Sequence, residues 1–198
     1  MSYTEQAHVL LEEWVQSESL RKHCYAVAAS MRHFARLNGA DEDLWGAVGL
    51  LHDLDYERHP NLEHSPTEGH PFVAVAYLRA QGWSEEICRA ILAHADYSDV
   101  RPANALEKTI VAVDELSSFV IAVALVRASK SIFDVDVAAV KKKMKDKAFA
   151  RAVDRAEIAH GAELLGLSLD DLIGHVITAL RGSADQLGVQ GLRTEDRG

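Results

Sequence analysis

The sequence predicts an all-α protein, a single-domain helical bundle of about 8–10 helices. Apolar residues recur at three- and four-residue steps along almost the whole chain, and no stretch alternates apolar and polar residues long enough to indicate a strand. With 198 residues, of which 48% are hydrophobic, the chain can bury one sizeable core. We therefore expect one domain over residues 1–187 and a disordered tail over residues 188–198.

The first three helices are predicted from their apolar stripes and their stop signals. The first spans about 4–16, and the second spans about 19–38, where Asn38-Gly39 supplies a residue suited to the left-handed helix end. The third, about 42–53, is apolar on most sides and should lie at the centre. Residues 54–68 are rich in charge, His and Pro, which predicts a long loop of the kind that often carries function.

The remaining helices follow the same pattern. We expect them at about 70–81, 84–95 and 105–127, and then at about 134–144, 147–152, 154–166 and 169–187. The apolar segment 105–127 contains Asp114 and Glu115, each of which would cost roughly 2.5–3.5 kcal/mol near the centre of a bilayer. This segment is therefore predicted to be a buried helix, not a membrane span.

Charge and cysteine content exclude several classes of protein. The formal net charge of −9 argues against a broad surface for nucleic acid, which depends on clustered Lys and Arg. Cys24 and Cys88 both lie within apolar helical patterns, so neither a disulfide framework nor a thiolate zinc site is indicated. The first residues lack a basic region followed by an apolar run. We expect a cytoplasmic protein that binds neither extended nucleic acid nor a membrane.

Polar residues in apolar surroundings raise the question of what they bind. The stretch "GLLHDLDYERH", residues 49–59, runs from apolar residues directly into His52 and Asp53. Asp114 lies on a strongly apolar helix, where a carboxylate is rarely buried without a positive partner. His23 and His94 lie on or beside the apolar stripes of their own helices. All of these side chains should point at or near the core.

Four predicted helices thus direct nitrogen or oxygen ligands inward, and a fifth begins with another histidine. The candidate metal ligands are His23, His52, Asp53, His70, His94 and Asp114. Any one of these histidines alone is more often a hydrogen-bonded core or surface residue, and Asp114 alone would ordinarily pair with Arg or Lys. A shared divalent metal ion accounts for all of them together. Imidazole plus carboxylate ligation suits Mn, Fe, Zn, Co or Ni better than Mg.

The order H…HD…H…H…D resembles the HD-domain superfamily of metal-dependent phosphohydrolases, and the likeness covers about residues 20–128. The stretches "LLHDLDYERHP" and "LEKTIVAVDELSSF" are most similar to an uncharacterised group of predicted HD hydrolases. The resemblance implies one or two divalent metal ions. Its implied first-ion ligands are His23, His52, Asp53 and Asp114; its implied second-ion ligands are His70 and His94, with Asp53 bridging. His64 could stand in for His70.

The resemblance also implies a reaction. We expect a phosphomonoesterase, phosphodiesterase or nucleotide hydrolase that uses metal-activated water on a small phosphorylated molecule such as a nucleotide. Asp53 belongs to the catalytic set through its metal ligation, while Asp55 and Glu57 could orient the attacking water or protonate the leaving oxygen. Candidates for contact with a substrate phosphate are Arg58, His59, Arg101 and Lys108.

The sequence departs from the common "HDIGK" form of the motif and leaves other functions open. Asp55 stands where that form has glycine and Tyr56 where it has lysine, which removes a phosphate-contacting cation. The ligand set also resembles the di-iron oxygenases of this fold, in which the metals activate dioxygen. A non-catalytic HD-type binding module is the third interpretation.

Overall fold

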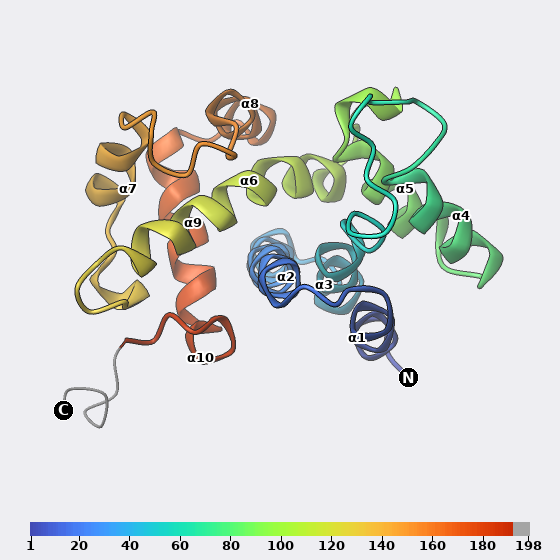
Figure 1. Ribbon diagram of the computed structural model, residues 1–198, viewed down its shortest axis with the longest axis horizontal. Helices are drawn as coiled ribbons and strands as arrows, with labels where there is room; N and C mark the ends of the chain where they lie inside the picture. Colours follow the sequence, from blue (N-terminus) through green and yellow to red (C-terminus); the bar gives the residue numbers. More distant parts are fainter. Residues whose placement is uncertain (192–198) are drawn as a thin grey trace.

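The computed structural model describes residues 1–191 and is all-α over that part of the chain (Figure 1), which confirms the predicted fold class. The described residues form ten α-helices and two short 3-10 helices. The α-helices are α1 (Tyr3–Trp14), α2 (Glu18–Asn38), α3 (Glu42–Leu51), α4 (Phe72–Ala80), α5 (Glu85–Ala93), α6 (Ala105–Leu125), α7 (Val137–Met144), α8 (Arg155–Leu165), α9 (Leu169–Arg181) and α10 (Ala184–Leu187). The 3-10 helices are η1 (Asp96–Ser98) and η2 (Ile132–Asp134).

Polar side chains fix where several of these helices begin. Ser17, Asp41, Ser84 and Asn104 each accept a hydrogen bond from a backbone N–H in the first turn of α2, α3, α5 and α6. Gly39 ends α2 with a φ of 62°, a conformation that glycine adopts without steric cost. The predicted boundaries of these helices therefore lie close to the observed ones.

The prediction of a helix at 147–152 is wrong, because this segment forms turns. The side chain of Arg155 reaches back and donates hydrogen bonds to backbone carbonyls that a helix would have used itself. These carbonyls belong to Asp146, Phe149, Ala150 and Val153.

The predicted helix 169–187 is in fact two helices, since α9 ends at Arg181, with Gly182 as its C-cap, and α10 begins after Ser183. The bend lets the chain return to the core, where Val189 is fully buried and its carbonyl accepts a hydrogen bond from Ile132 N–H at 2.7 Å. Of the tail expected at 188–198, Val189 is therefore packed in the core, whereas Gly188 and Gln190 are exposed, and residues 192–198 lie outside the described part of the chain.

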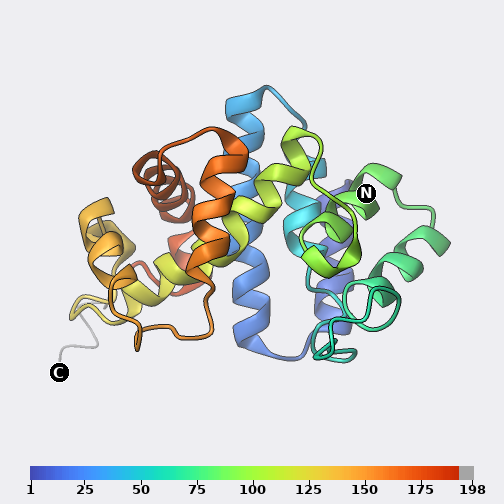
Figure 2. The same cartoon turned by 90° about the horizontal axis from the view of Figure 1, so that it is seen from above.

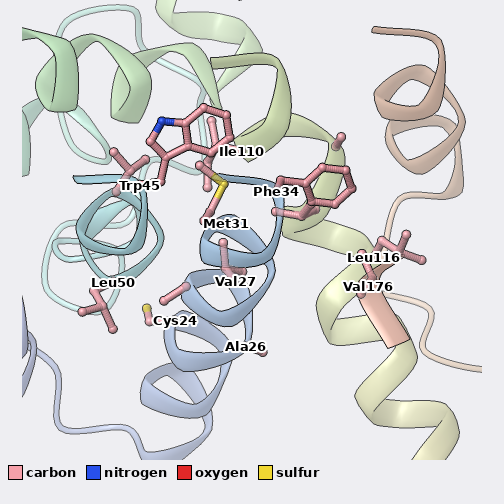
Figure 3. Packing of buried hydrophobic residues seen from close by; sticks show 14 of the residues in the cluster. Cys24, Ala26, Val27, Met31, Phe34, Trp45, Leu50, Ile110, Leu116 and Val176 are labelled. Carbon is pink, nitrogen blue, oxygen red and sulfur yellow. The ribbon is translucent and has the colours of Figure 1, made fainter. Parts of the chain in front are cut away.

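The core is built around α2, which packs against α3, α6 and α9 (Figures 1 and 2). Figure 2 shows α6 crossing α2 near the centre of the molecule. Buried side chains from these four helices form one cluster, which includes Met31, Trp45, Ile110 and Val176 (Figure 3). The crossing of α2 and α3 is close because Gly49 has no Cβ, and one placed there would lie 2.5 Å from the Cα of Ala28. This close approach brings the C-terminal end of α3 beside the middle of α2.

The long segment between α3 and α4 consists of turns, as its composition indicates. Both of its ends lie in the interior, since His52 is fully buried and His70 is 4% exposed. Between these ends, residues 56–60 lie at the surface. Separately, none of the helices formed by residues 1–191 has the length and apolar composition needed to cross a membrane.

Candidate metal centre

Six side chains from five parts of the chain meet beside the crossing of α2 and α3. His23 comes from α2 and Asp114 from the middle of α6, while the other four directly follow or precede helices. The six form two groups of three, and within each group one ligand atom per residue lies within 4.8 Å of the others. The first cluster is His23, His52 and Asp114; the second cluster is Asp53, His70 and His94.

In the first cluster two imidazoles converge on one carboxylate. Asp114 Oδ1 lies 3.1 Å from His23 Nε2 and 3.4 Å from His52 Nε2. The two Nε2 atoms are 3.0 Å apart. Two nitrogens and one oxygen thus point into the same small space, which is a ligand set that first-row divalent metals bind.

The second cluster also consists of two histidines and one aspartate, and it lies beside the first. His70 Nε2 and His94 Nε2 are 3.2 Å apart, and Asp53 Oδ1 lies 3.4 Å and 3.8 Å from them. The other oxygen, Asp53 Oδ2, faces the first cluster and lies 3.4 Å from His23 Nε2. The two oxygens of Asp53 therefore face different clusters, as a bridging carboxylate would.

All four histidines present Nε2 to the clusters, because each Nδ1 is engaged elsewhere. His52 and His94 occupy equivalent places just after α3 and α5, and each ring folds back to donate to the carbonyl three residues earlier. These carbonyls belong to Gly49, at 2.9 Å, and Ile91, at 2.5 Å. The Nδ1 atoms of His23 and His70 lie 2.7 Å and 2.8 Å from Ser118 Oγ and Asp55 Oδ1. Such contacts hold a ring in the tautomer that leaves Nε2 free as a ligand.

The buried charges of the first cluster stabilise one another when no metal ion is bound. Burial alone would lower the pKa of His23, but hydrogen bonds to Asp114 and Asp53 outweigh it and raise the pKa to about 10. Burial would raise the pKa of Asp53 and of Asp114, but the neighbouring His52 and His23 hold both well below the usual range. In contrast, burial and the neighbouring His70 and His52 lower the pKa of His94 to about 4.

The position of Asp55 corrects the expectation that this residue would orient the attacking water. Asp55 is fully buried, and both of its oxygens are occupied. Oδ1 accepts from His70 Nδ1 at 2.8 Å, and Oδ2 accepts from the backbone N–H of Ala74 at 2.7 Å. The turn that follows α3 has rotated this carboxylate behind His70, away from the space between the clusters.

Glu57 and Arg58 also bind the protein itself. Glu57 Oε2 accepts from the backbone N–H groups of Gln16 and Ser17, at 2.7 and 3.1 Å, and so stabilises the start of α2. Arg58 donates to the carbonyl of Glu13 at 2.5 Å. Both side chains are exposed and directed at the connection between α1 and α2, so the catalytic and phosphate-binding roles expected for them have no support in this geometry.

Of the two histidines considered for the second cluster, the structure brings in His70. His64 is exposed and stacks on Tyr97 at a ring distance of 4.6 Å. Ser118, which contacts His23, was missed by the sequence reasoning. Its signal was available, because Ser118 lies four residues after Asp114 and so on the same face of α6.

Two further acidic residues near the first cluster were also not anticipated. Burial, and then the charges of Asp114 and Glu157, raise the pKa of Glu115 to about 7. Burial and the charge of Asp114 likewise raise the pKa of Glu157, which lies on α8. The sequence around Glu115 and Glu157 did not indicate that their pKa values would be raised, because α6 and α8 come together only in the folded chain.

Fold and site together define a class: all-α proteins in which four histidines and two aspartates form two adjacent groups that could hold metal ions. A comparison with family models gives the family of this chain. The model of the HD domain matches residues 20–118, half of the chain, and this match contains all six clustered residues. The chain belongs to the HD-domain family, which is part of a superfamily of metal-dependent phosphohydrolases.

A curated relative supports the same family. The chain is 30% identical over 96 residues to ribonuclease Y of Cutibacterium acnes. The match covers 48% of this chain but 17% of ribonuclease Y, so most of that protein has no counterpart here.

Ion binding to the first cluster should release protons. His23, with a pKa of about 10, is protonated at pH 7 and must lose its proton before Nε2 can be a ligand. The affinity for the ion should therefore increase with pH, by up to about tenfold per unit below pH 10. Titration calorimetry with Zn²⁺ at pH 7, in buffers of different ionisation enthalpy, measures the proton release directly.

The second cluster supplies the internal comparison for this measurement. His94, with a pKa of about 4, is already neutral at pH 7, so ion binding should displace no proton from it. A His23→Gln variant should lose the proton release while it keeps ion binding at the second cluster. Equal heats in all buffers for the wild-type protein would contradict the charge state given to His23.

Proposed function

We propose that this protein is a metal-dependent phosphohydrolase that acts on a small phosphorylated molecule such as a nucleotide. The observation that carries the proposal is the shared carboxylate: Asp53 directs Oδ2 to the first cluster and Oδ1 to the second. This geometry suits two adjacent ions of Mn, Fe, Zn, Co or Ni, and membership of the HD-domain family supports hydrolysis as their use.

The ligands also define the side from which a substrate would approach. His52 is fully buried and the side chains of His70 and His94 are about as inaccessible, whereas 14% of Asp53 and 20% of Asp114 remain exposed. His52, His70 and His94 thus form the floor of the site, whereas Asp53 and Asp114 lie on its solvent side together with His23, whose side chain is 18% exposed. A substrate phosphate would meet the centre along the edge formed by Asp53 and Asp114.

This arrangement makes phosphate binding depend on metal. Protonated His23 offsets only part of the charge of the two carboxylates at the entrance, and the formal net charge of −9 further disfavours an anionic substrate. Bound ions would reverse the local charge, polarise a phosphoryl oxygen and lower the pKa of water to about 7. The chain's own residues hold the ligand atoms in place, with Asp53 shared and each Nε2 oriented by the hydrogen bond at Nδ1.

The net charge and the relative both bear on the proposed size of the substrate. The acidic chain is poorly suited to extended nucleic acid, which favours a small phosphomonoester, phosphodiester or nucleotide. The name of the relative, a ribonuclease, makes a phosphodiester between nucleotides a class worth including.

The first experiment is elemental analysis of protein purified without added metal, followed by a screen for released phosphate or nucleotide. The screen should use Mn²⁺, Fe²⁺, Zn²⁺, Co²⁺ and Ni²⁺ with three substrate groups: phosphomonoesters, cyclic and linear phosphodiesters, and short oligoribonucleotides. We expect hydrolysis of at least one small substrate, abolished by chelation and by Asp53→Asn. Asp43→Asn, a change of the same kind at the far end of α3, serves as the control that keeps activity.

The same preparation separates this function from its alternatives. Consumption of dioxygen by an iron-loaded protein, with no hydrolysis, would establish an oxygenase instead. A folded protein that takes up no ion even at excess metal would be a binding module. Either result would exclude the phosphohydrolase.

A further inference from the structure

Asp55 is a fully buried acid beside the second cluster. Each of its two carboxylate oxygens accepts a hydrogen bond. Oδ1 accepts from His70 Nδ1 at 2.8 Å. Oδ2 accepts from Ala74 N–H at 2.7 Å, in the first turn of α4. A carboxylate is rarely buried unless such partners compensate its lost hydration, so this pair of contacts needs an explanation.

One explanation is that Asp55 serves only as a helix cap. The position before α4 is occupied by Pro71, which offers no side-chain hydrogen bond, so a cap from elsewhere would stabilise this helix. The contact with His70, however, goes beyond capping. A cap alone would leave His70 free to choose either tautomer, whereas Asp55 holds the proton on Nδ1.

The comparison among the four clustered histidines gives Asp55 a more specific role. His23, His52 and His94 each pair Nδ1 with a neutral group: the hydroxyl of Ser118 and the carbonyls of Gly49 and Ile91. His70 pairs with a carboxylate. A carboxylate on the far nitrogen fixes the ring and makes Nε2 a stronger electron donor toward a metal.

We propose that Asp55 is a positioning residue that sets the metal affinity of the second cluster and thereby allows this protein to hold two ions. It acts through His70 and touches neither ion nor substrate. The inference rests on the proposed metal centre but not on the reaction, because ion binding can be measured without turnover. It also accounts for the aspartate in this position of "HDLDYERH", where the common form of the motif has glycine.

The test compares Asp55→Asn with two matched variants. Asn keeps the shape of the side chain but removes the charge, and it can accept from only one of the two donors. Asp43→Asn removes the charge from another capping carboxylate, which accepts from the N–H groups of Tyr3 and Thr4 far from the clusters. Ser118→Ala removes the corresponding Nδ1 partner from His23 in the first cluster.

Metal binding is followed by titration with Mn²⁺ and by the spin coupling between two bound Mn²⁺ ions. We expect two coupled ions in the wild-type protein and in Asp43→Asn. In Asp55→Asn the second ion should bind about 10- to 100-fold more weakly, while the first stays within about threefold of wild type. Ser118→Ala should show the opposite pattern, with weaker binding of the ion at the first cluster and unchanged binding at the second.

Three results would overturn the proposal: two coupled ions bound by Asp55→Asn with wild-type affinity, equal weakening of both sites in a folded variant, or a wild-type protein that never holds a second ion. If Asp55→Asn does not fold, ¹⁵N-histidine spectra of the wild-type protein decide the matter. His70, assigned by a His70→Gln variant, should carry its proton on Nδ1 with and without Zn²⁺, and a proton on Nε2 would refute the role. Two bound ions without any phosphate release would instead contradict the proposed function and leave Asp55 its role.

Discussion

Replacing Asp53 by Asn is expected to weaken ion binding at both clusters by more than about 100-fold and to abolish turnover. The reason is that one side chain serves both: Oδ2 faces His23 and Oδ1 faces His70. Loss of a partner that only orients a ligand already costs about 10- to 100-fold, and Asp53 is a ligand itself. Titration calorimetry with Zn²⁺ or Mn²⁺ measures both steps.

Changes to ligands that belong to one cluster give the comparison for Asp53→Asn. His94→Gln should lose the second ion and keep the first, and His23→Gln should do the opposite. If Asp53→Asn retained one of the two sites at wild-type affinity, Asp53 would not be shared, and the geometry of its two oxygens would have no functional meaning.

Gly49→Ala is expected to cause a large loss of stability, about 3 kcal/mol or more. Its new Cβ would lie 2.5 Å from the Cα and 2.6 Å from the N of Ala28. Both are backbone atoms of a helix, so relief requires α2 and α3 to separate. For a chain of this length the melting temperature should fall by about 6–12 °C, and thermal unfolding of the metal-free protein measures the change.

A second glycine isolates this effect from a general response to alanine. Gly174 lies within α9, and a Cβ there would meet only Val137 Cγ2 at 3.9 Å. Gly174→Ala should stabilise the protein by about 0.5–1 kcal/mol, because alanine favours the helix. Unchanged stability of Gly49→Ala would show that the contact of α2 and α3 can widen freely, and ion binding to His52 would then be expected to persist as well.

Much of the fold could be predicted because it follows from local rules. Apolar periodicity and capping residues placed α1 to α6 close to their observed ends. The failures at 147–152 and at 169–187 share one cause, which is competition from groups that lie outside the segment itself. The guanidinium of Arg155 takes carbonyls in the first segment, and the return of Val189 to the core bends the second.

The candidate site was predictable to a similar depth. Burial arguments singled out the residues, since a carboxylate such as Asp114 and a histidine such as His94 need a reason to lie in apolar surroundings. Burial arguments could not predict in which direction each side chain points. Asp55 follows the His-Asp doublet so closely that it was expected beside the water, but the turn after α3 directs it to the back of His70. Which oxygen of Asp53 faces which cluster is likewise decided only in the folded chain.

The two clusters are held by different kinds of structure, helices for the first and turns for the second, and this difference bears on the order in which they form. His23 and Asp114 stand within long helices that the core fixes, and His52 is attached to the end of a third. The second cluster depends on the turns between α3 and α4, since both Asp53 and His70 belong to that segment. Docking of α2, α3 and α6 alone would align the first three ligands. The second cluster is complete only when these turns are in place, so we expect an ion at the second cluster to bind after the ion at the first and to dissociate before it.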